Sequence, residues 1–220
     1  MNAKSKFIVA AIGIVALGAA AYSQLPMGGP HSMQGMGSPA STAAAASEST
    51  KAYEQAMAGM MKAMMAPLTG KPDLDFMQGM IPHHQGAIDM AKVALQYGKD
   101  AEINALAKSV IKAQETEIAF MKAWLGKVNP SALPAVSESA KGNEDAMSAM
   151  IKNMVAPLTG DADVDFAQGM IPHHQGAIGM AKVALQFAKD PEVLKLAQAI
   201  VSAQESEIAF MTGWLAKHGK

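Results

Sequence analysis

The chain contains one helical pattern twice, and this duplication limits the folds that it can adopt. Residues 56–127 recur as residues 146–217 at a constant offset of 90 (173 − 83 = 90), and roughly two-thirds of the paired positions are identical. Each copy holds a short Met-rich segment and two long amphipathic segments, near residues 73–98 and 100–126 in the first copy. Abundant Ala and Met with few aromatic residues favour helix over sheet. Because a lone hairpin exposes its apolar face, we predict an all-α four-helix bundle of two hairpins, flanked by short Met-rich helices.

Proline, glycine and aspartate predict where these helices begin and end. The short helix should end near Ala66, because proline disfavours helix in the residue before it. Asp73 or Asp75 is the expected N-cap of the next helix. In the second copy, Asp190-Pro191-Glu192 combines an N-cap, a proline at the first helical position and an acid in the first turn. Residues 130–143 should form the loop that joins the copies.

The N-terminal sequence predicts export. Lys4 and Lys6 precede an apolar run over residues 7–21, and small residues then offer cleavage after Ala21 or Ser23. Residues 1–23 are therefore the expected signal peptide, with an uncleaved N-terminal anchor as the alternative, and the expected location is the periplasm. Residues 24–50, rich in Gly, Pro, Ser and Ala, should form a flexible linker that carries Met and His. The helical bundle should then occupy residues 51–218.

The chemistry of each copy is concentrated in two motifs. Met80–Ile88 occurs letter for letter as Met170–Ile178, and these segments hold four of the six histidines in a chain without cysteine. At about 100° per residue, the histidines share one helix face with an inward-pointing methionine. On the partner helix a second face carries Leu106, Val110, Ala113, Gln114, Glu117, Met121 and Trp124, and its counterpart in the second copy carries Gln204, Glu207, Met211 and Trp214. Glu115 should point to solvent.

A carboxylate on an otherwise apolar face needs a partner, and His83 or His84 is the nearest candidate for Glu117. Such a pair can be purely structural. Four imidazoles, two carboxylates and at least four thioethers directed to one interior instead favour a metal site. The predicted ligands are His83, His84, His173, His174, Met80, Met170, Met121, Met211, Glu117 and Glu207.

The remaining methionines can be sorted by comparing the copies. Met61, Met65 and Met77 are replaced in the second copy by Ile151, Val155 and Ala167, so these positions accept plain apolar side chains. Methionine is kept in both copies at Met57, Met60, Met64, Met147, Met150 and Met154, which are the candidates for a secondary thioether site. Thioether with imidazole suits Cu(I), whereas imidazole with carboxylate also admits Cu(II) or Zn(II).

Pro82 and Pro172 directly precede the histidines, and two geometries remain open. Each proline either interrupts one hydrogen bond inside a continuous helix or occupies the first position of a helix that restarts there. Both arrangements favour the neutral imidazole, which is the form that binds metal.

With these motifs the chain resembles the DUF305 family, a bacterial domain of unknown function. The resemblance rests on the Met-Ile-x-His-His-x-x-Ala-Ile-x-Met pattern of Met80–Met90 and on the Gln-x-x-Glu-Ile-x-x-Met-x-x-Trp-Leu pattern of Gln114–Leu125, each repeated 90 residues later. It implies a ferritin-like helical bundle, often exported, and copper or silver binding by Met and His. The family includes periplasmic copper-binding proteins linked to copper resistance.

The favoured function is therefore a non-enzymatic, periplasmic copper-binding protein that sequesters Cu(I), or Cu(II) or Ag(I), or delivers it to a copper exporter or another periplasmic copper protein. A di-iron oxidase is a rival, but the chain has no Glu-x-x-His motif. A metal-free structural bundle, with His–Glu pairs as polar ties, is the second rival. A net charge of −1 gives no reason to expect nucleic acid as a partner.

Overall fold

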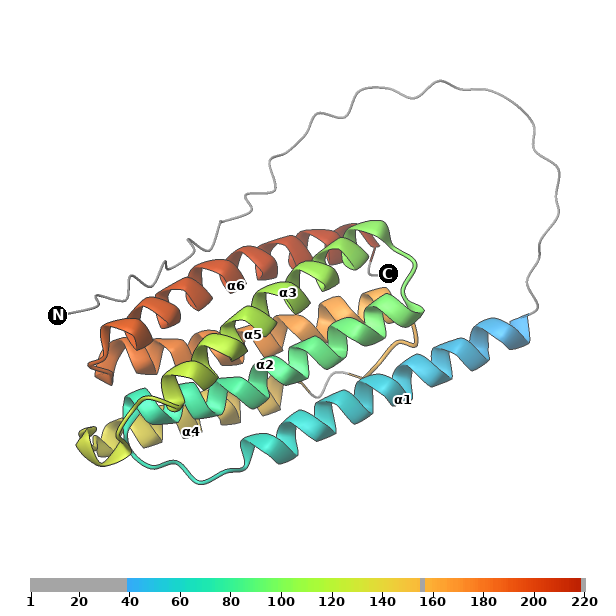
Figure 1. Cartoon of the computed structure of the whole chain (residues 1–220). Helices are drawn as coiled ribbons and strands as arrows, with labels where there is room; N and C mark the ends of the chain where they lie inside the picture. The colour runs from blue at the N-terminus through green and yellow to red at the C-terminus, as the bar shows by residue number, and fades with distance from the viewer. Residues whose placement is uncertain (1–38, 155–156, 219–220) are drawn as a thin grey trace, which may run out of the picture. The chain divides into compact units, whose positions relative to one another are not determined.

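The structure, a computed structural model, describes residues 39–154 and 157–218 as a helical body. Its elements are α1 Pro39–Met64, α2 Pro72–Tyr97, α3 Ala101–Leu125, the 3₁₀ turn η1 Pro130–Ala132, α4 Ser137–Asn153, α5 Ala162–Phe187 and α6 Pro191–His218 (Figure 1). The described residues contain no strand, which confirms the all-α prediction. The predicted signal peptide and the linker as far as residue 38 lie outside the described residues. Across residues 39–154 and 157–218, no helix has both the length and the apolar character of a membrane span.

The helices of the body form three layers. The central helices α2 and α5 pack against each other, and each pairs with the next helix in the chain, α2 with α3 and α5 with α6. The preceding helices α1 and α4 cover α2 and α5 respectively. Figure 1 shows α3 and α6 on one side of the central pair, with α1 and α4 on the opposite side. The four long helices of the two hairpins therefore form the predicted bundle, flanked by α1 and α4.

The two central helices meet through matched glycine contacts. A Cβ atom added to Gly79 would lie 3.0 Å from the Cε of Met180, and one added to Gly169 would lie 2.9 Å from the Cε of Met90. On each of the two helices, a glycine thus lies against a methionine of the other helix. The two contacts are equivalent, because Gly169 and Met180 are the counterparts of Gly79 and Met90 at the repeat offset of 90. The repeats are therefore related by an approximate twofold axis that passes between α2 and α5.

A second matched contact joins the repeats at the helix ends. The carboxylate of Asp73 accepts hydrogen bonds from the backbone N–H groups of Lys189 (3.1 Å) and Asp190 (2.8 Å). The carboxylate of Asp163 accepts from the N–H groups of Lys99 (2.7 Å) and Asp100 (3.0 Å). Each repeat therefore supplies a buried carboxylate that binds the backbone where the other repeat's last helix begins.

The N-cap predicted for α2 is wrong. Lys71 occupies the cap position, and its side chain makes no cap hydrogen bond. Asp73 turns to the other repeat, while Asp75 accepts hydrogen bonds from the backbone N–H and the hydroxyl of Thr69 at 2.7 and 2.6 Å. The expected cap at Asp190 is confirmed, and Asp100 caps α3 in the same way, because each carboxylate accepts from two N–H groups in the first turn of the following helix.

Two segments expected to be irregular are helical. Helix α1 begins at Pro39, inside the predicted linker of residues 24–50, because the Ala-rich sequence after Pro39 is a good helix former. Helix α4 begins at Ser137, inside the predicted loop of residues 130–143. The flanking helices are therefore longer than expected. Gly70 lies in the connection between α1 and α2 and Gly160 in the connection between α4 and α5, and their φ angles of 73° and 85° are ones that glycine adopts readily.

Pro82 and Pro172 lie inside continuous helices, so the alternative in which the helix restarts is wrong. Each proline lacks an N–H for the carbonyl four residues earlier, at Gln78 or Gln168. Neighbouring helices pack on both faces of α2 and of α5, and this packing keeps each helix continuous at the missing hydrogen bond.

Candidate functional site

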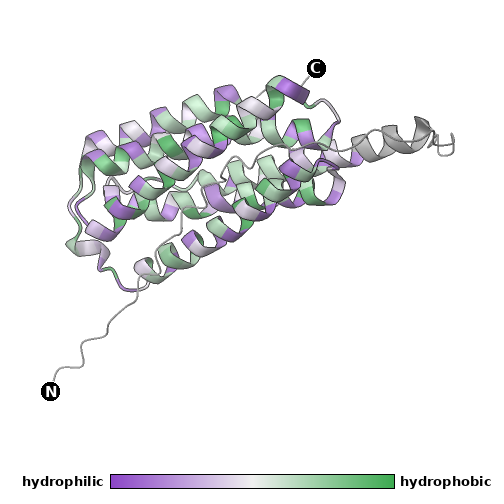
Figure 2. Cartoon of the chain, turned by 90° about the horizontal axis from the view of Figure 1, so that it is seen from above, coloured by the Kyte–Doolittle hydropathy of each residue, from purple (hydrophilic) through white to green (hydrophobic). Residues whose placement is uncertain are grey.

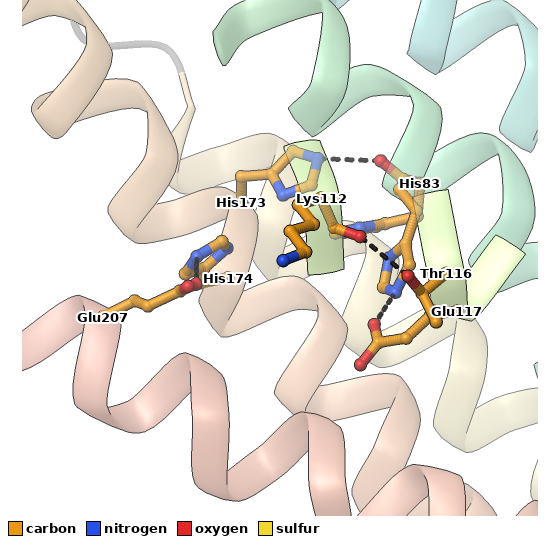
Figure 3. Close-up of polar contacts among 8 residues, drawn as sticks. His83, Lys112, Thr116, Glu117, His173, His174 and Glu207 are labelled. Atoms are coloured by element: carbon orange, nitrogen blue, oxygen red, sulfur yellow. Dashed lines mark hydrogen bonds and ion pairs between the residues drawn. The ribbon is translucent and has the colours of Figure 1, made fainter. Parts of the chain in front are cut away.

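The four histidines of the duplicated motif form one buried layer in the middle of the bundle. His83 and His84 come from α2, His173 and His174 from α5, and each has an exposed fraction of 0% (Figure 3). Two apolar clusters adjoin this layer. The first cluster includes Met80, Met121, Met60, Met64 and Met150, and the second includes Met90, Met170, Met211, Phe166 and Tyr53. Figure 2 shows hydrophobic positions along all the helices of the body, as expected for helices packed on a shared core.

His83 and His173 meet across the approximate twofold axis. Their ring centroids are 3.9 Å apart, and the ring planes are inclined at 56°. His173 Nε2 donates a hydrogen bond to the backbone carbonyl oxygen of His83 over 3.1 Å. Within the described part of the chain, neither ring nitrogen of His83 has a hydrogen-bond partner, and neither does Nδ1 of His173. The repeats thus place three unpartnered imidazole nitrogens together, one of which must be the unprotonated Nδ1 of His173.

The outer histidines pair with the predicted carboxylates. His84 Nε2 lies 2.6 Å from Glu117 Oε2, and His174 Nε2 lies 2.6 Å from Glu207 Oε2. The sequence left His83 and His84 as alternative partners for Glu117, and the structure selects His84. The carboxylate side chains are 11% and 20% exposed, so they connect the buried rings with the surface of α3 and α6.

Burial keeps the inner pair of histidines neutral. It lowers the pKa of both His83 and His173 well below the usual histidine range, and the neighbouring imidazoles lower the pKa of each further. The rings of His84 and His174 lie next to them, with centroid separations of 6.4 Å and 6.1 Å within each motif. Neutral imidazole is the form that ligates metal ions, so the layer supplies donors in the required state.

The imidazoles and carboxylates do not form a complete metal shell by themselves. Among residues 39–154 and 157–218, no group of three or more His, Asp or Glu side chains is arranged to hold an ion. A metal at this layer would therefore need ligands of another kind. Thioethers are the candidates, and the structure buries Met80 and Met121 fully in the first cluster and Met170 and Met211 fully in the second.

The secondary methionines are spread over several places. Met60 lies over Gly86, and Met150 lies over Gly176, with Sδ 2.7 Å from the position of an added Cβ in both cases. Met64 is buried, whereas Met57, Met147 and Met154 are half-buried. Met57 from α1 and Met154, which directly follows α4, line one small pocket together with Asp165, so the structure brings together methionines of different repeats.

The predicted inward face of α3 is correct except at one position. Leu106, Val110, Gln114, Glu117, Met121 and Trp124 are buried, and Glu115 is exposed as expected, but Ala113 is exposed. In the second copy, Gln204, Met211 and Trp214 are buried and Glu207 is half-buried. Ala113 lies at the edge that faces α6, where the two helices leave a small opening. The helical wheel could not predict this opening, because it depends on the separation of two helices from different repeats.

The model of the family described as "Domain of unknown function (DUF305)" matches residues 73–215, which include both histidine motifs. Among solved structures, the chain is 36% identical to CopM in a silver-bound form, covering 66% of this chain and 95% of that one with a TM-score of 0.50. CopM has also been solved with Cu(I), at 36% identity and a TM-score of 0.50, and with Cu(II), at 34% identity and a TM-score of 0.51. Each of these two alignments covers 66% of this chain and 96% of CopM.

Other relatives give the same fold or cover less of the chain. A DUF305 fragment from Deinococcus radiodurans is 30% identical with a TM-score of 0.51, and the match covers 69% of this chain and 99% of the fragment. A curated viral relative, "Uncharacterized protein L153" of Acanthamoeba polyphaga mimivirus, is 42% identical over 53 residues. That match spans 24% of this chain and only 35% of the viral protein.

Proposed function

The chain belongs to the DUF305 family, and from this membership we propose that it is a copper-binding protein whose main site is the histidine layer. The observation that carries the proposal is the group of buried, unpartnered imidazole nitrogens on His83 and His173. Leaving such nitrogens without a partner in a protein interior is unfavourable, and a bound metal would remove that penalty. CopM, which shares this fold, has been solved with Cu(I), Cu(II) and silver bound.

The donor set favours Cu(I) or Ag(I) over harder ions. His83, His84, His173 and His174 would supply imidazole nitrogen, and Met80, Met121, Met170 and Met211 would supply thioether sulfur from the adjoining clusters. Soft thioethers suit Cu(I), and they need not lose a proton to bind. Glu117 and Glu207 would orient the outer histidines and would become direct ligands only for Cu(II) or Zn(II).

The proposed role is to sequester copper or to deliver it, in the periplasm, to a copper exporter or another copper protein. Export is supported by the basic and apolar N-terminal sequence. Binding rather than catalysis is supported by the full burial of the four histidines, none of which is exposed to a substrate in solution.

The test is a titration of the mature protein, from Gln24 onward, with Cu(I) under reducing conditions against a coloured chelator. We expect tight uptake that is lost when His83, His84, His173 and His174 are all replaced by Ala. The matched control is Gln85→Ala with Gln175→Ala, because these exposed glutamines directly follow the histidines in both copies. Unchanged Cu(I) affinity in the four-histidine variant, with helical content preserved, would reject the assignment.

A structural role for the layer is the second candidate, because the His–Glu contacts at 2.6 Å are complete without a metal. That role predicts no competition with the chelator and a large loss of stability in the four-histidine variant. If copper uptake is absent, an aerobic Fe(II) oxidation assay separates this role from that of an iron oxidase.

A further inference from the structure

The four histidines are fully buried, so an ion from solution needs a route between the surrounding helices to reach them. On one side of the bundle, α1 and α4 cover the central helices (Figure 1). Met60 packs against Gly86 there, and Met150 packs against Gly176, each with Sδ only 2.7 Å from the position of an added Cβ. This side is closed by tightly packed methionines, which leaves the opposite side, formed by α3 and α6.

A small pocket opens between α3 and α6. Each of the two helices contributes an alanine, a glutamine and a glutamate to its wall, and the two sets are counterparts at the repeat offset of 90: Ala113, Gln114 and Glu117, and Ala203, Gln204 and Glu207. Helix α3 packs mainly on α2, and α6 packs mainly on α5, which leaves space for the pocket between them.

In each repeat, one carboxylate links this pocket with the histidine layer. Glu117 lines the pocket, reaches solvent and lies 2.6 Å from Nε2 of the buried His84. Glu207 links the pocket with His174 in the same way. Figure 3 shows the two carboxylates apart from each other, so each reaches only the outer histidine of its own repeat. A single side chain therefore lies between the pocket and each outer histidine.

The glutamines add polar atoms that are suited to brief contact with a cation. Gln114 and Gln204 are each only 3% exposed, and across residues 39–154 and 157–218 the Oε1 atom of each lacks a hydrogen-bond partner. Amide and carboxylate oxygens attract a cation, but they hold Cu(I) less well than imidazole and thioether do. An ion can therefore pass from the oxygen atoms of the pocket to the nitrogen and sulfur donors inside.

We propose that the pocket between α3 and α6 is the passage by which copper enters and leaves the histidine layer, an inference that rests on the proposed copper-binding function. Glu117 and Glu207 are the first charged groups that the ion meets. Each must turn away from its histidine to admit the ion, so the two side chains act as gates. Because entry and release use the same passage, blocking it slows both by the same factor and leaves the equilibrium affinity unchanged.

The passage can be blocked without changing its polar groups. Ala113 and Ala203 line the pocket and are exposed, so the side chains of Ala113→Trp/Ala203→Trp can cover it. Mixed without oxygen with Cu(I) held by a coloured chelator, this variant should take up and release Cu(I) at least about tenfold more slowly, with an affinity within about twofold of the unchanged protein. The control is Ala119→Trp/Ala209→Trp, at exposed positions on the same helices outside the pocket, which should keep both rates.

A block can also be added after the protein has folded, because the chain contains no cysteine. The two thiols of Ala113→Cys/Ala203→Cys can be alkylated selectively, with a small acetamide group or with a large pyrene group, before copper is added. Uptake and release should be slow with the pyrene label and close to the rates of the unchanged protein with the acetamide label. Two labels on one folded protein separate a blocked passage from a change in folding.

The four-histidine variant shows which copper is bound at the layer, and uptake that persists in it is subtracted. Equal rates with the large and the small label would overturn the passage while leaving the copper site in place. If the unchanged protein takes up no more Cu(I) than the four-histidine variant, the proposed function and the passage are both overturned.

Discussion

Folding changes how readily His83 and His173 take up a proton. In the folded protein their pKa values are lowered by burial and by neighbouring imidazoles, while in the unfolded chain they return to the usual histidine range. As the pH falls into that range, the unfolded chain therefore binds protons that the folded protein does not. The stabilisation from the neutral pair is complete above the usual histidine pKa and is lost progressively below it.

We accordingly expect the metal-free protein to lose stability between pH 7.5 and pH 5. In the lower part of that window, each of the two histidines should contribute a loss of up to about 1.4 kcal/mol per pH unit. Urea unfolding at a series of pH values measures this slope. His83→Gln/His173→Gln should flatten it, while His218→Gln, at an exposed position near the C-terminus, should not. Equal slopes in the first variant and the unchanged protein would contradict the prediction.

At the scale of elements, α1 can lie close to α2 only because residue 86 is glycine. An added Cβ would lie 2.7 Å from Cγ and Sδ of Met60 and 2.8 Å from its Cβ. The Cβ of Met60 is fixed to the backbone of α1, so the whole helix would have to move. We expect Gly86→Ala to lower the free energy of unfolding by about 1–3 kcal/mol, measured by chemical denaturation.

Gly59 on α1 offers a matched control. Among the described residues, no heavy atom lies within 4 Å of a Cβ added there. Gly59→Ala should therefore stabilise the protein by about 0.5–1 kcal/mol through helix propensity alone. Adding Met60→Ala to Gly86→Ala should remove the contacts with Cγ and Sδ and recover part of the loss, while the contact with the Cβ of residue 60 remains. A Gly86→Ala variant as stable as Gly59→Ala would mean that α1 does not pack as described.

The elements also show what the sequence could predict. Periodicity located α2 and α3 to within a residue or two, because buried positions recur at helical spacing along the full length of each helix. The partners of Asp73 could not be predicted, since Lys189 lies 116 residues away. For the histidines, helical spacing predicted that the side chains point inward. The contact between His83 and His173 could not be predicted, because it depends on how the two repeats pack.

At the scale of the whole molecule, the repeats depend on each other. A fragment of residues 39–128, holding α1 to α3, would lose the cap that Asp163 gives to Lys99 and Asp100 and would expose the face of α2 that packs on α5. We expect the monomeric fragment to be poorly folded, with no cooperative transition in thermal circular dichroism at low concentration. A sharp transition that does not change on dilution would contradict the dependence.

Mixing two fragments provides the control. Adding residues 129–220 to residues 39–128 should restore a cooperative melt, because the cut falls in the connection before η1 and leaves every helix intact. If the mixture melts as two independent fragments do, the repeats are separate folding units.

The matched contacts between the two repeats have a consequence for how the site behaves when the protein is scarce. One repeat alone holds both halves of each contact, a glycine and a methionine, and an aspartate and the backbone that it caps. Two single-repeat chains therefore have the groups needed to build the same histidine layer, but only at concentrations that favour association. Joining the repeats fixes the effective concentration of one half for the other. In the joined chain, the histidine layer remains assembled however dilute the protein becomes.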